Sequence, residues 1–175
     1  SIIDTAINLP QTAAPSWGYF SISDFADFDL ENPANVSQWY IQTAGDTIEG
    51  GLRARLTMFW MNHFVTELDS YGSYAPYMFQ YYNLMQTHAL GNFKEFVRAV
   101  GVNSTMLIYL NGFENTSNNP NENYARELFE LFTLGENNNY TQEDIIQASR
   151  ALTGYNHWDD PCLLYTSDAA DEEDS

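Results

Sequence analysis

The sequence predicts an all-α fold, with five to seven helices in a bundle-like or orthogonal packing. Three observations lead to this fold class. Apolar residues recur at intervals of three and four over most of residues 52–156, which is the spacing of one helix face. Residues that favour helix starts and helix ends bracket those segments. No stretch alternates apolar and polar residues in the way that predicts a strand.

The clearest pair of helices lies in the stretch PNENYARELFELFTLGENNNYTQEDIIQASRALTG, which ends at residue 154. Asn119 or Asn121 caps the first helix, and Gly135 follows its last apolar residue as a stop. Thr141 opens the second helix, and Asp144 three residues later completes a capping-box arrangement. We therefore expect two consecutive helices joined by a polar loop.

Further helices are predicted upstream of this pair. Residues 52–68 are apolar nearly all round, so we expect that helix to be buried on most sides. Asn92 caps another helix, on which Phe93 and Phe96 recur at the spacing of an apolar face. Residues 1–51 predict only a loosely structured N-terminal segment, before a helical core at residues 52–156. The other predicted helices are residues 77–90 and 104–110.

Acidic residues outnumber basic ones by 24 to 6, which gives the chain a formal charge of −18. Nucleic acids and anionic membranes bind through clustered lysine and arginine, so we expect neither as a partner. No apolar run approaches the roughly 18 residues that a membrane-spanning helix needs. The composition therefore indicates an acidic folded domain without a membrane span, and its 44% of hydrophobic residues is enough for a core.

The last residues of the chain form a separate segment. The string CLLYTSDAADE, which begins at Cys162, is similar to the translation of a transposon adapter used in sequencing libraries. We therefore expect residues 162–175 to be a non-native tail that forms no packed element. On this interpretation residues 1–161 are a partial helical domain, truncated at its C-terminal end.

Several blocks of the sequence resemble one protein family. NENYARELFELFTLG and YTQEDIIQASRALTG together closely resemble the signature of the bacterial domain of unknown function 1800 family. The blocks LRARLTMFWMNHFVT, THALGNFKEFVRAV and MLIYLNG resemble other parts of it, so the likeness covers residues 52–156. In the first of these blocks the resemblance leads us to expect a second histidine where this chain has Met61. That departure argues against a metal site in this chain.

The resemblance implies a bacterial, mostly helical protein that often carries an export signal, and therefore a periplasmic or secreted location. Genes of the family often neighbour those of the domain of unknown function 1501 family, which implies a partner protein from that second family. The sequence itself shows no signal peptide and begins at Ser1. The expected location therefore rests on the resemblance alone.

Two polar residues within apolar helix faces form the candidate site. Glu127 lies in an apolar arc that includes Leu131 and Leu134, and His63 lies on an apolar face of its own helix. Burying a lone carboxylate costs several kcal/mol, so we expect Glu127 to meet His63 or another polar partner in the helical interior. The other members of this predicted polar network are Arg55, Asn62, His88, Asn123 and Arg126.

Two interpretations of this network stay open. In one, Glu127 acts as a base or ligand in an interior site beside His63. In the other, the network ties helices together without any chemistry. Glu130 stands where the Glu-x-x-His pair of a dinuclear metal site would have its histidine, so no metal site is predicted. The sequence predicts no cofactor and no serine nucleophile of the Gly-x-Ser-x-Gly type, and it leaves a metal ion open.

We expect the protein to be an exported helical binding or assembly module that acts with a partner protein. The absence of a recognisable catalytic arrangement and the family resemblance favour this function. The alternative is an extracytoplasmic enzyme of the hydrolase kind, which would use Glu127 with His63 or a bound metal.

Overall fold

The computed structural model describes residues 11–13, 39, 43, 51–67, 70 and 75–155. The chain divides into two compact units, Ser1–Val100 and Gly101–Ser175, and each unit is described by itself. Most of the predicted N-terminal segment and the whole of the predicted tail lie outside the described residues.

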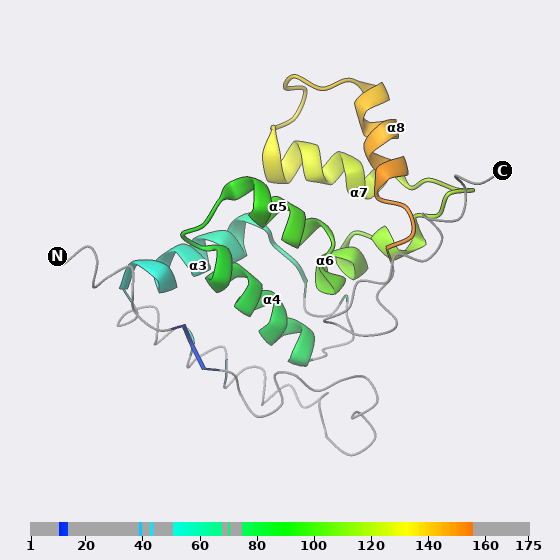
Figure 1. The fold of residues 1–175 in the computed structure, drawn as a ribbon. Coiled ribbons are helices and arrows are strands. Elements are labelled where there is room, and N and C mark those ends of the chain that lie inside the picture. Colours follow the sequence, from blue (N-terminus) through cyan, green and yellow to red (C-terminus); the bar gives the residue numbers. More distant parts are fainter. Residues whose placement is uncertain are drawn as a thin grey trace, which may run out of the picture. The chain divides into compact units, whose positions relative to one another are not determined.

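The described helices of the first unit are α3 (Gly51–His63), α4 (Ala75–His88) and α5 (Phe93–Gly101). α3 and α4 pack against each other (Figure 1). The predicted cap of α5 is confirmed, because Asn92 Oδ1 accepts the Lys94 N–H at 2.9 Å. The helix predicted over residues 52–68 ends earlier, at His63.

Aromatic and methionine side chains fill the core of the first unit, and those at most 1% exposed include Phe64, Phe79, Tyr81, Met85 and Phe96. The Tyr81 hydroxyl donates to the Phe64 carbonyl oxygen at 2.6 Å, which fixes the chain where it leaves α3. On α3 itself only Thr57 is fully buried, so the expectation that this helix is buried on most sides is wrong. A helix that is apolar nearly all round still buries only the sides on which a neighbour packs.

The side-chain amide of Gln86 is buried in α4 and pairs with the main chain of Thr12. Its Oε1 accepts the Thr12 N–H at 2.9 Å, and its Nε2 donates to the Thr12 carbonyl at 3.2 Å. The same nitrogen donates to Asn83 Oδ1 at 2.9 Å. The Gln86 carbonyl accepts from Arg53 Nη1 of α3 at 2.9 Å, so one residue of α4 binds both α3 and residues 11–13.

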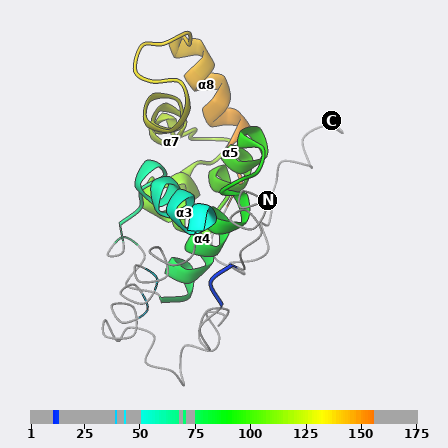
Figure 2. The same ribbon diagram turned by 90° about the vertical axis from the view of Figure 1, so that its left-hand side faces the viewer.

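The second unit contains α6 (Ser104–Tyr109), the 3₁₀ turn η3 (Gly112–Glu114), α7 (Glu122–Glu127), the π-helix η4 (Leu128–Thr133) and α8 (Gln142–Ala151). η4 continues directly from α7, and α8 packs against α7 (Figure 1). Figure 2 shows α7 nearly end-on and α8 from its side, so these two helices cross steeply.

The helix starts and ends of the second unit follow the sequence signals. Asn121 is the cap of α7, because its Oδ1 accepts the Asn123 N–H at 3.0 Å. Thr141 and Asp144 form the predicted capping box of α8, with both of its hydrogen bonds present. Gly135 follows η4 with a φ of +89°, in the left-handed region that favours glycine.

The side-chain amide of Asn115 links the end of α8 to the start of α7. Asn115 is 1% exposed. Its Nδ2 donates to the Ser149 carbonyl in the last turn of α8 at 2.7 Å, and its Oδ1 accepts the Asn121 N–H at 2.8 Å. Its main-chain carbonyl accepts the Gly154 N–H at 3.2 Å, and its own N–H donates to the Gly112 carbonyl at 3.1 Å. Every polar group of this buried residue therefore has a partner.

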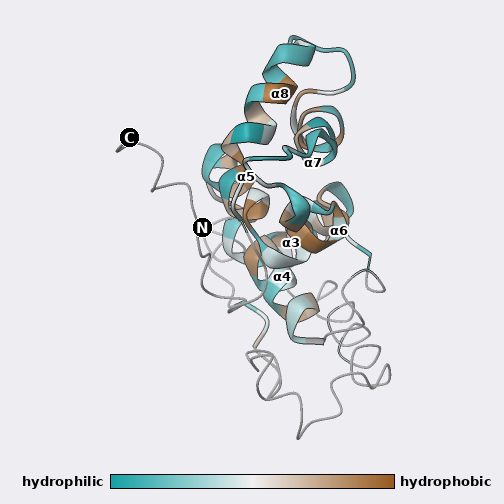
Figure 3. Ribbon diagram, turned by 90° about the vertical axis from the view of Figure 1, so that its right-hand side faces the viewer, coloured by the Kyte–Doolittle hydropathy of each residue, from teal (hydrophilic) through white to brown (hydrophobic). Residues whose placement is uncertain are grey.

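The apolar core of the second unit surrounds Tyr124. This side chain is fully buried, its hydroxyl donates to the Gly101 carbonyl, and burial raises its pKa well above the ordinary value for tyrosine. Gly112 lies so close that an added Cβ would come within 2.7 Å of Leu107 Cδ2 and 2.9 Å of Tyr124 Cδ1. α8 contributes the buried Ile145, and Figure 3 shows this helix as mostly hydrophilic with one hydrophobic band.

The all-α prediction is confirmed for the part of the chain that the structure describes. That part contains six α-helices and no strand, and Thr116 and Asn119 form an isolated bridge. The number of helices lies within the predicted range, and the steep crossing of α7 and α8 is an orthogonal packing.

We predict that Asn115→Ala destabilises the protein by about 1–3 kcal/mol for each group that it leaves unpaired. The reason is that the Asn121 N–H loses its partner, and the Ser149 carbonyl keeps only the 3.3 Å hydrogen bond from the Leu152 N–H. Urea unfolding followed by far-ultraviolet circular dichroism measures the loss as a lower transition midpoint at an unchanged slope. Asn118→Ala is the matched control, because Asn118 is exposed in the same loop. Equal midpoints for the two variants would contradict the role assigned to Asn115.

Candidate functional site

The predicted site residues are divided between the two units. The first unit contains Arg55, Asn62, His63 and His88, and the second contains Asn123, Arg126 and Glu127. Because each unit is described by itself, the approach of Glu127 to His63 stays a prediction.

His63 is the last residue of α3 and lies half-buried among aromatic rings. Its ring is stacked on Phe59 at a centroid distance of 6.3 Å. It meets the edges of Trp60 at 5.7 Å and Phe64 at 4.7 Å. The apolar surroundings predicted for His63 are therefore present, although the side chain lies at the border of the unit rather than in its interior.

An aromatic ledge, which we define as Phe59, Trp60, His63 and Phe93, lies at the surface of the first unit. Phe59 is 55% exposed and Phe93 is 45% exposed, whereas Trp60 and His63 are half-buried. The Trp60 ring lies 4.9 Å from Phe59 and 5.8 Å from Phe93, measured between centroids. Helical spacing alone assigned Phe93 to an apolar face, and the structure leaves it largely in solvent.

The other network residues of the first unit lie outside its interior. Arg55 and Asn62 are exposed on α3. His88 is half-buried at the end of α4, with its ring stacked on Phe96 at 5.3 Å. A positively charged side chain in the last turn of a helix interacts favourably with the helix dipole.

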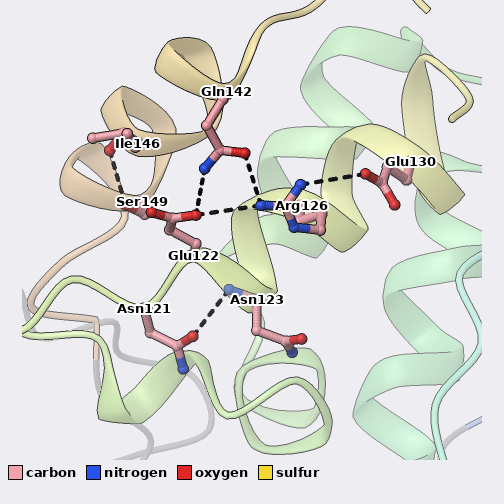
Figure 4. Close-up of polar contacts among 8 residues, drawn as sticks. All are labelled: Asn121, Glu122, Asn123, Arg126, Glu130, Gln142, Ile146 and Ser149. Atoms are coloured by element: carbon pink, nitrogen blue, oxygen red, sulfur yellow. Dashed lines mark hydrogen bonds and ion pairs between the residues drawn. The ribbon is translucent and has the colours of Figure 1, made fainter. Parts of the chain in front are cut away.

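Arg126 is the centre of a polar cluster between α7 and α8 (Figure 4). Its Nη2 donates to Glu122 Oε2 at 3.3 Å and to Gln142 Oε1 at 3.0 Å, and its Nη1 lies 3.6 Å from Glu130 Oε1. Gln142 Nε2 also donates to Glu122 Oε2 at 2.6 Å. The side chains of Arg126, Glu122 and Glu130 are 36%, 40% and 23% exposed, so each ion pair contributes little to stability. Both pairs lie along α7 and η4, whereas the hydrogen bonds of Gln142 join α8 to α7.

Asn123 takes part in the start of α7 rather than in this cluster. It is exposed, its N–H is the donor to the Asn121 cap, and its Nδ2 donates to the Leu110 carbonyl at 3.4 Å. Its side chain therefore ties α7 to the end of α6.

Glu127 lies at the junction where α7 gives way to the π-helix η4. It is half-buried, and no hydrogen bond or ion pair joins its carboxylate to another described residue. π-Helical segments are rare, and they occur frequently at functional sites. Among the described residues of its unit, the carboxylate of Glu127 is therefore available for binding or chemistry.

The apolar arc predicted around Glu127 is narrower than the sequence indicated. Leu131 is 60% exposed and Leu134 is 42% exposed, which contradicts their assignment to that arc. The prediction assumed α-helical geometry throughout, whereas the N–H of Leu134 bonds to the Phe129 carbonyl five residues earlier. This wider winding turns the two leucines away from the buried face.

The loop between η4 and α8 is held by its own polar groups. Asn138 Nδ2 donates to the Leu134 carbonyl at 2.7 Å, and the Tyr140 hydroxyl accepts the Asn137 N–H at 3.0 Å. Desolvation of the Tyr140 hydroxyl raises its pKa, and the nearby Glu130 carboxylate raises it further.

A model of one protein family, described as "Protein of unknown function (DUF1800)", matches residues 11–174. The chain belongs to the DUF1800 family. The match includes residues 162–174, and the interpretation of this segment as a non-native tail stays a prediction. No curated protein and no solved structure matches the chain.

In the described residues of this DUF1800 protein, no group of three or more histidine, cysteine, aspartate or glutamate side chains is placed to hold a metal ion. None of the helices in this part of the chain has the length and apolar character to cross a membrane.

Sequence reasoning missed the exposed members of the ledge and the two buried amides. Aromatic residues at helical spacing normally indicate core, and nothing local distinguishes Phe59 from the fully buried Phe64. The Asn-rich loop containing Asn115 has several similar asparagines, and the residue that becomes buried depends on how α8 returns to it.

Asp144 gives the DUF1800 protein a pH-dependent contribution to stability. Its hydrogen bonds from the Thr141 hydroxyl and N–H, each 2.7 Å long, lower the pKa of the Asp144 carboxyl. Because the pKa of Asp144 is lower in the folded state than in the unfolded state, its ionised form stabilises the fold at a pH above the ordinary aspartate pKa. This stabilisation disappears as the pH falls through the folded-state pKa. We predict that wild type exceeds Asp144→Asn in unfolding free energy at neutral pH, and that the gap closes below about pH 4. A gap that is independent of pH in urea titrations would contradict this.

Proposed function

We propose that this protein is an exported helical binding module that docks a partner protein on the aromatic ledge of its first unit. The observation that carries the proposal is the exposure of Phe59 (55%) and Phe93 (45%), whose rings both lie beside Trp60. Single exposed apolar residues are normal on a protein surface, whereas contiguous exposed patches mark interaction sites.

The ledge is held in place before any partner arrives. The Trp60 Nε1–H donates to the Ala89 carbonyl at 3.2 Å. The Trp60 ring also rests on the buried rings of Phe64 and Phe96, at centroid distances of 5.8 Å and 5.2 Å. Because these rings are already packed, binding would cost little side-chain entropy. Large rigid aromatic residues are the typical anchors of protein interfaces.

The charges beside the ledge favour a partner with carboxylates around its apolar side chains. Arg55 lies one helical turn before Phe59 and is exposed, and the exposed Lys94 follows Phe93. Interfaces commonly have an apolar centre and a polar rim whose charges complement those of the partner.

The location and the class of the partner belong to the same proposal. The family resemblance supports an extracytoplasmic location in bacteria. It also supports a partner from the domain of unknown function 1501 family, encoded by a neighbouring gene.

An extracytoplasmic hydrolase is the second candidate function. Glu127 favours it, because this half-buried carboxylate has no hydrogen bond or ion pair among the described residues and stands at the start of η4. Stoichiometric metal in wild-type protein purified without chelator, absent from Glu127→Gln, would support this candidate over the binding module.

We predict that Phe59→Ser weakens binding of the neighbour-encoded partner roughly tenfold or more, because an exposed aromatic anchor is lost. Titration of the purified partner into the full chain, followed by calorimetry, measures the affinity. Val65→Ser is the matched control, since Val65 is 45% exposed and lies outside the ledge. If Phe59→Ser and Val65→Ser bind as tightly as wild type, the ledge is not the docking surface.

A further inference from the structure

A second exposed apolar surface lies on the π-helix η4 and the residue that directly follows it. We call it the η4 knob and define it as Leu131, which is 60% exposed, and Leu134, which is 42% exposed. Leu131 has the largest exposed fraction among the exposed large apolar residues of the described chain. The π-helical winding described above puts both leucines on the outside of the second unit, where each costs hydration free energy until something covers it.

Carboxylates surround the η4 knob. Glu127 lies one turn before Leu131, Glu130 precedes it directly, and the exposed Glu136 lies two residues after Leu134. Arg126 does not neutralise this surface alone, because its guanidinium is shared between Glu122 and Glu130. Residues 101–155 hold two basic and seven acidic residues, the latter being Glu114, Glu122, Glu127, Glu130, Glu136, Glu143 and Asp144.

The aromatic ledge has the complementary character. Residues 51–100 hold four of the six basic residues of the whole chain, Arg53, Arg55, Lys94 and Arg98, against three acidic ones, Glu67, Asp69 and Glu95. Glu95 pairs with Arg98 at 3.3 Å, which leaves Arg55 and Lys94 as the charges of the ledge. Arg55 and Lys94 lie beside the exposed rings, as described above. A surface of leucines between carboxylates therefore has the chemistry that a ledge of aromatic rings with a basic rim would bind.

We infer that the η4 knob of one copy of this protein docks on the aromatic ledge of a second copy. The inference rests on the proposed function, in that it takes the ledge to be a protein-binding surface, and it adds a second copy of the chain to the partner protein proposed above as an occupant of the ledge. The two surfaces differ, so the interface is heterologous. Repeating it either closes into a ring or extends into a chain of copies.

The heterologous geometry makes a complementation experiment possible. Phe59→Ser removes a ledge anchor and keeps the knob, and Leu131→Ser removes the knob and keeps the ledge. Both side chains are largely exposed, so neither change should unfold the protein, and far-ultraviolet circular dichroism checks this. Sedimentation velocity of the full chain over a range of concentrations measures association.

We expect wild type to form larger species as its concentration rises, and each single variant to associate at least roughly tenfold more weakly. An equimolar mixture of the two variants should give dimers and nothing larger, because only one intact ledge–knob pair is then available. Val65→Ser should assemble like wild type. Added salt should weaken the assembly, since the charged rims are solvent-exposed.

Three results would overturn the inference. One is wild type that stays monomeric at every concentration, and another is a variant mixture that stays monomeric while wild type assembles. The third is assembly unaffected by Leu131→Ser. If these occur while Phe59→Ser still weakens binding of the neighbour-encoded partner, the ledge remains a docking surface and self-association alone is excluded.

Discussion

The hydrogen bonding of the buried Asn115 amide is the interaction on which the second unit depends. The last carbonyls of α8 and the first N–H groups of α7 lack the full set of partners that the interior of a helix provides. Asn115 supplies one for each, at 2.7 Å to the Ser149 carbonyl and 2.8 Å from the Asn121 N–H. The first unit uses the same device, because the buried Gln86 amide pairs with the main chain of Thr12. In both units a buried side-chain amide therefore supplies hydrogen bonds to main-chain groups that lie outside regular secondary structure or at a helix end.

These hydrogen bonds fix the positions of the helices. Some apolar side chains of the helices nevertheless stay exposed in each unit. This exposed apolar surface is organised, since Phe59 and Phe93 lie beside Trp60 on one unit and two leucines follow Glu127 on the other. It also differs in charge, with a basic rim in the first case and an acidic one in the second. Proteins expose contiguous apolar surface mainly where something binds, so the two surfaces support a binding or assembly role.

The local features of the fold could be predicted from the sequence, and the tertiary ones could not. Caps such as Asn92, Asn121 and Thr141 act within one turn of chain, so their residue types are sufficient evidence. Burial depends on which neighbour packs against a helix, and that information is not local. The exposure of Leu131 depends moreover on a change from α-helical to π-helical winding, which no residue type in that segment signals. For the candidate site, the apolar surroundings of His63 were predictable, whereas its place at the edge of the ledge was not.

Hydroxyl-radical footprinting with residue-level mass spectrometry tests most directly whether these apolar side chains are surface rather than core. The protein is studied at a concentration at which it is monomeric, and residues of one type are compared with each other. The account predicts that Phe59 (55% exposed) is oxidised much faster than Phe79 (1%), and Leu131 (60%) much faster than Leu107 (0%). Phe59 and Leu131 protected as strongly as Phe79 and Leu107 would contradict it, because the ledge and the knob would then be parts of a core.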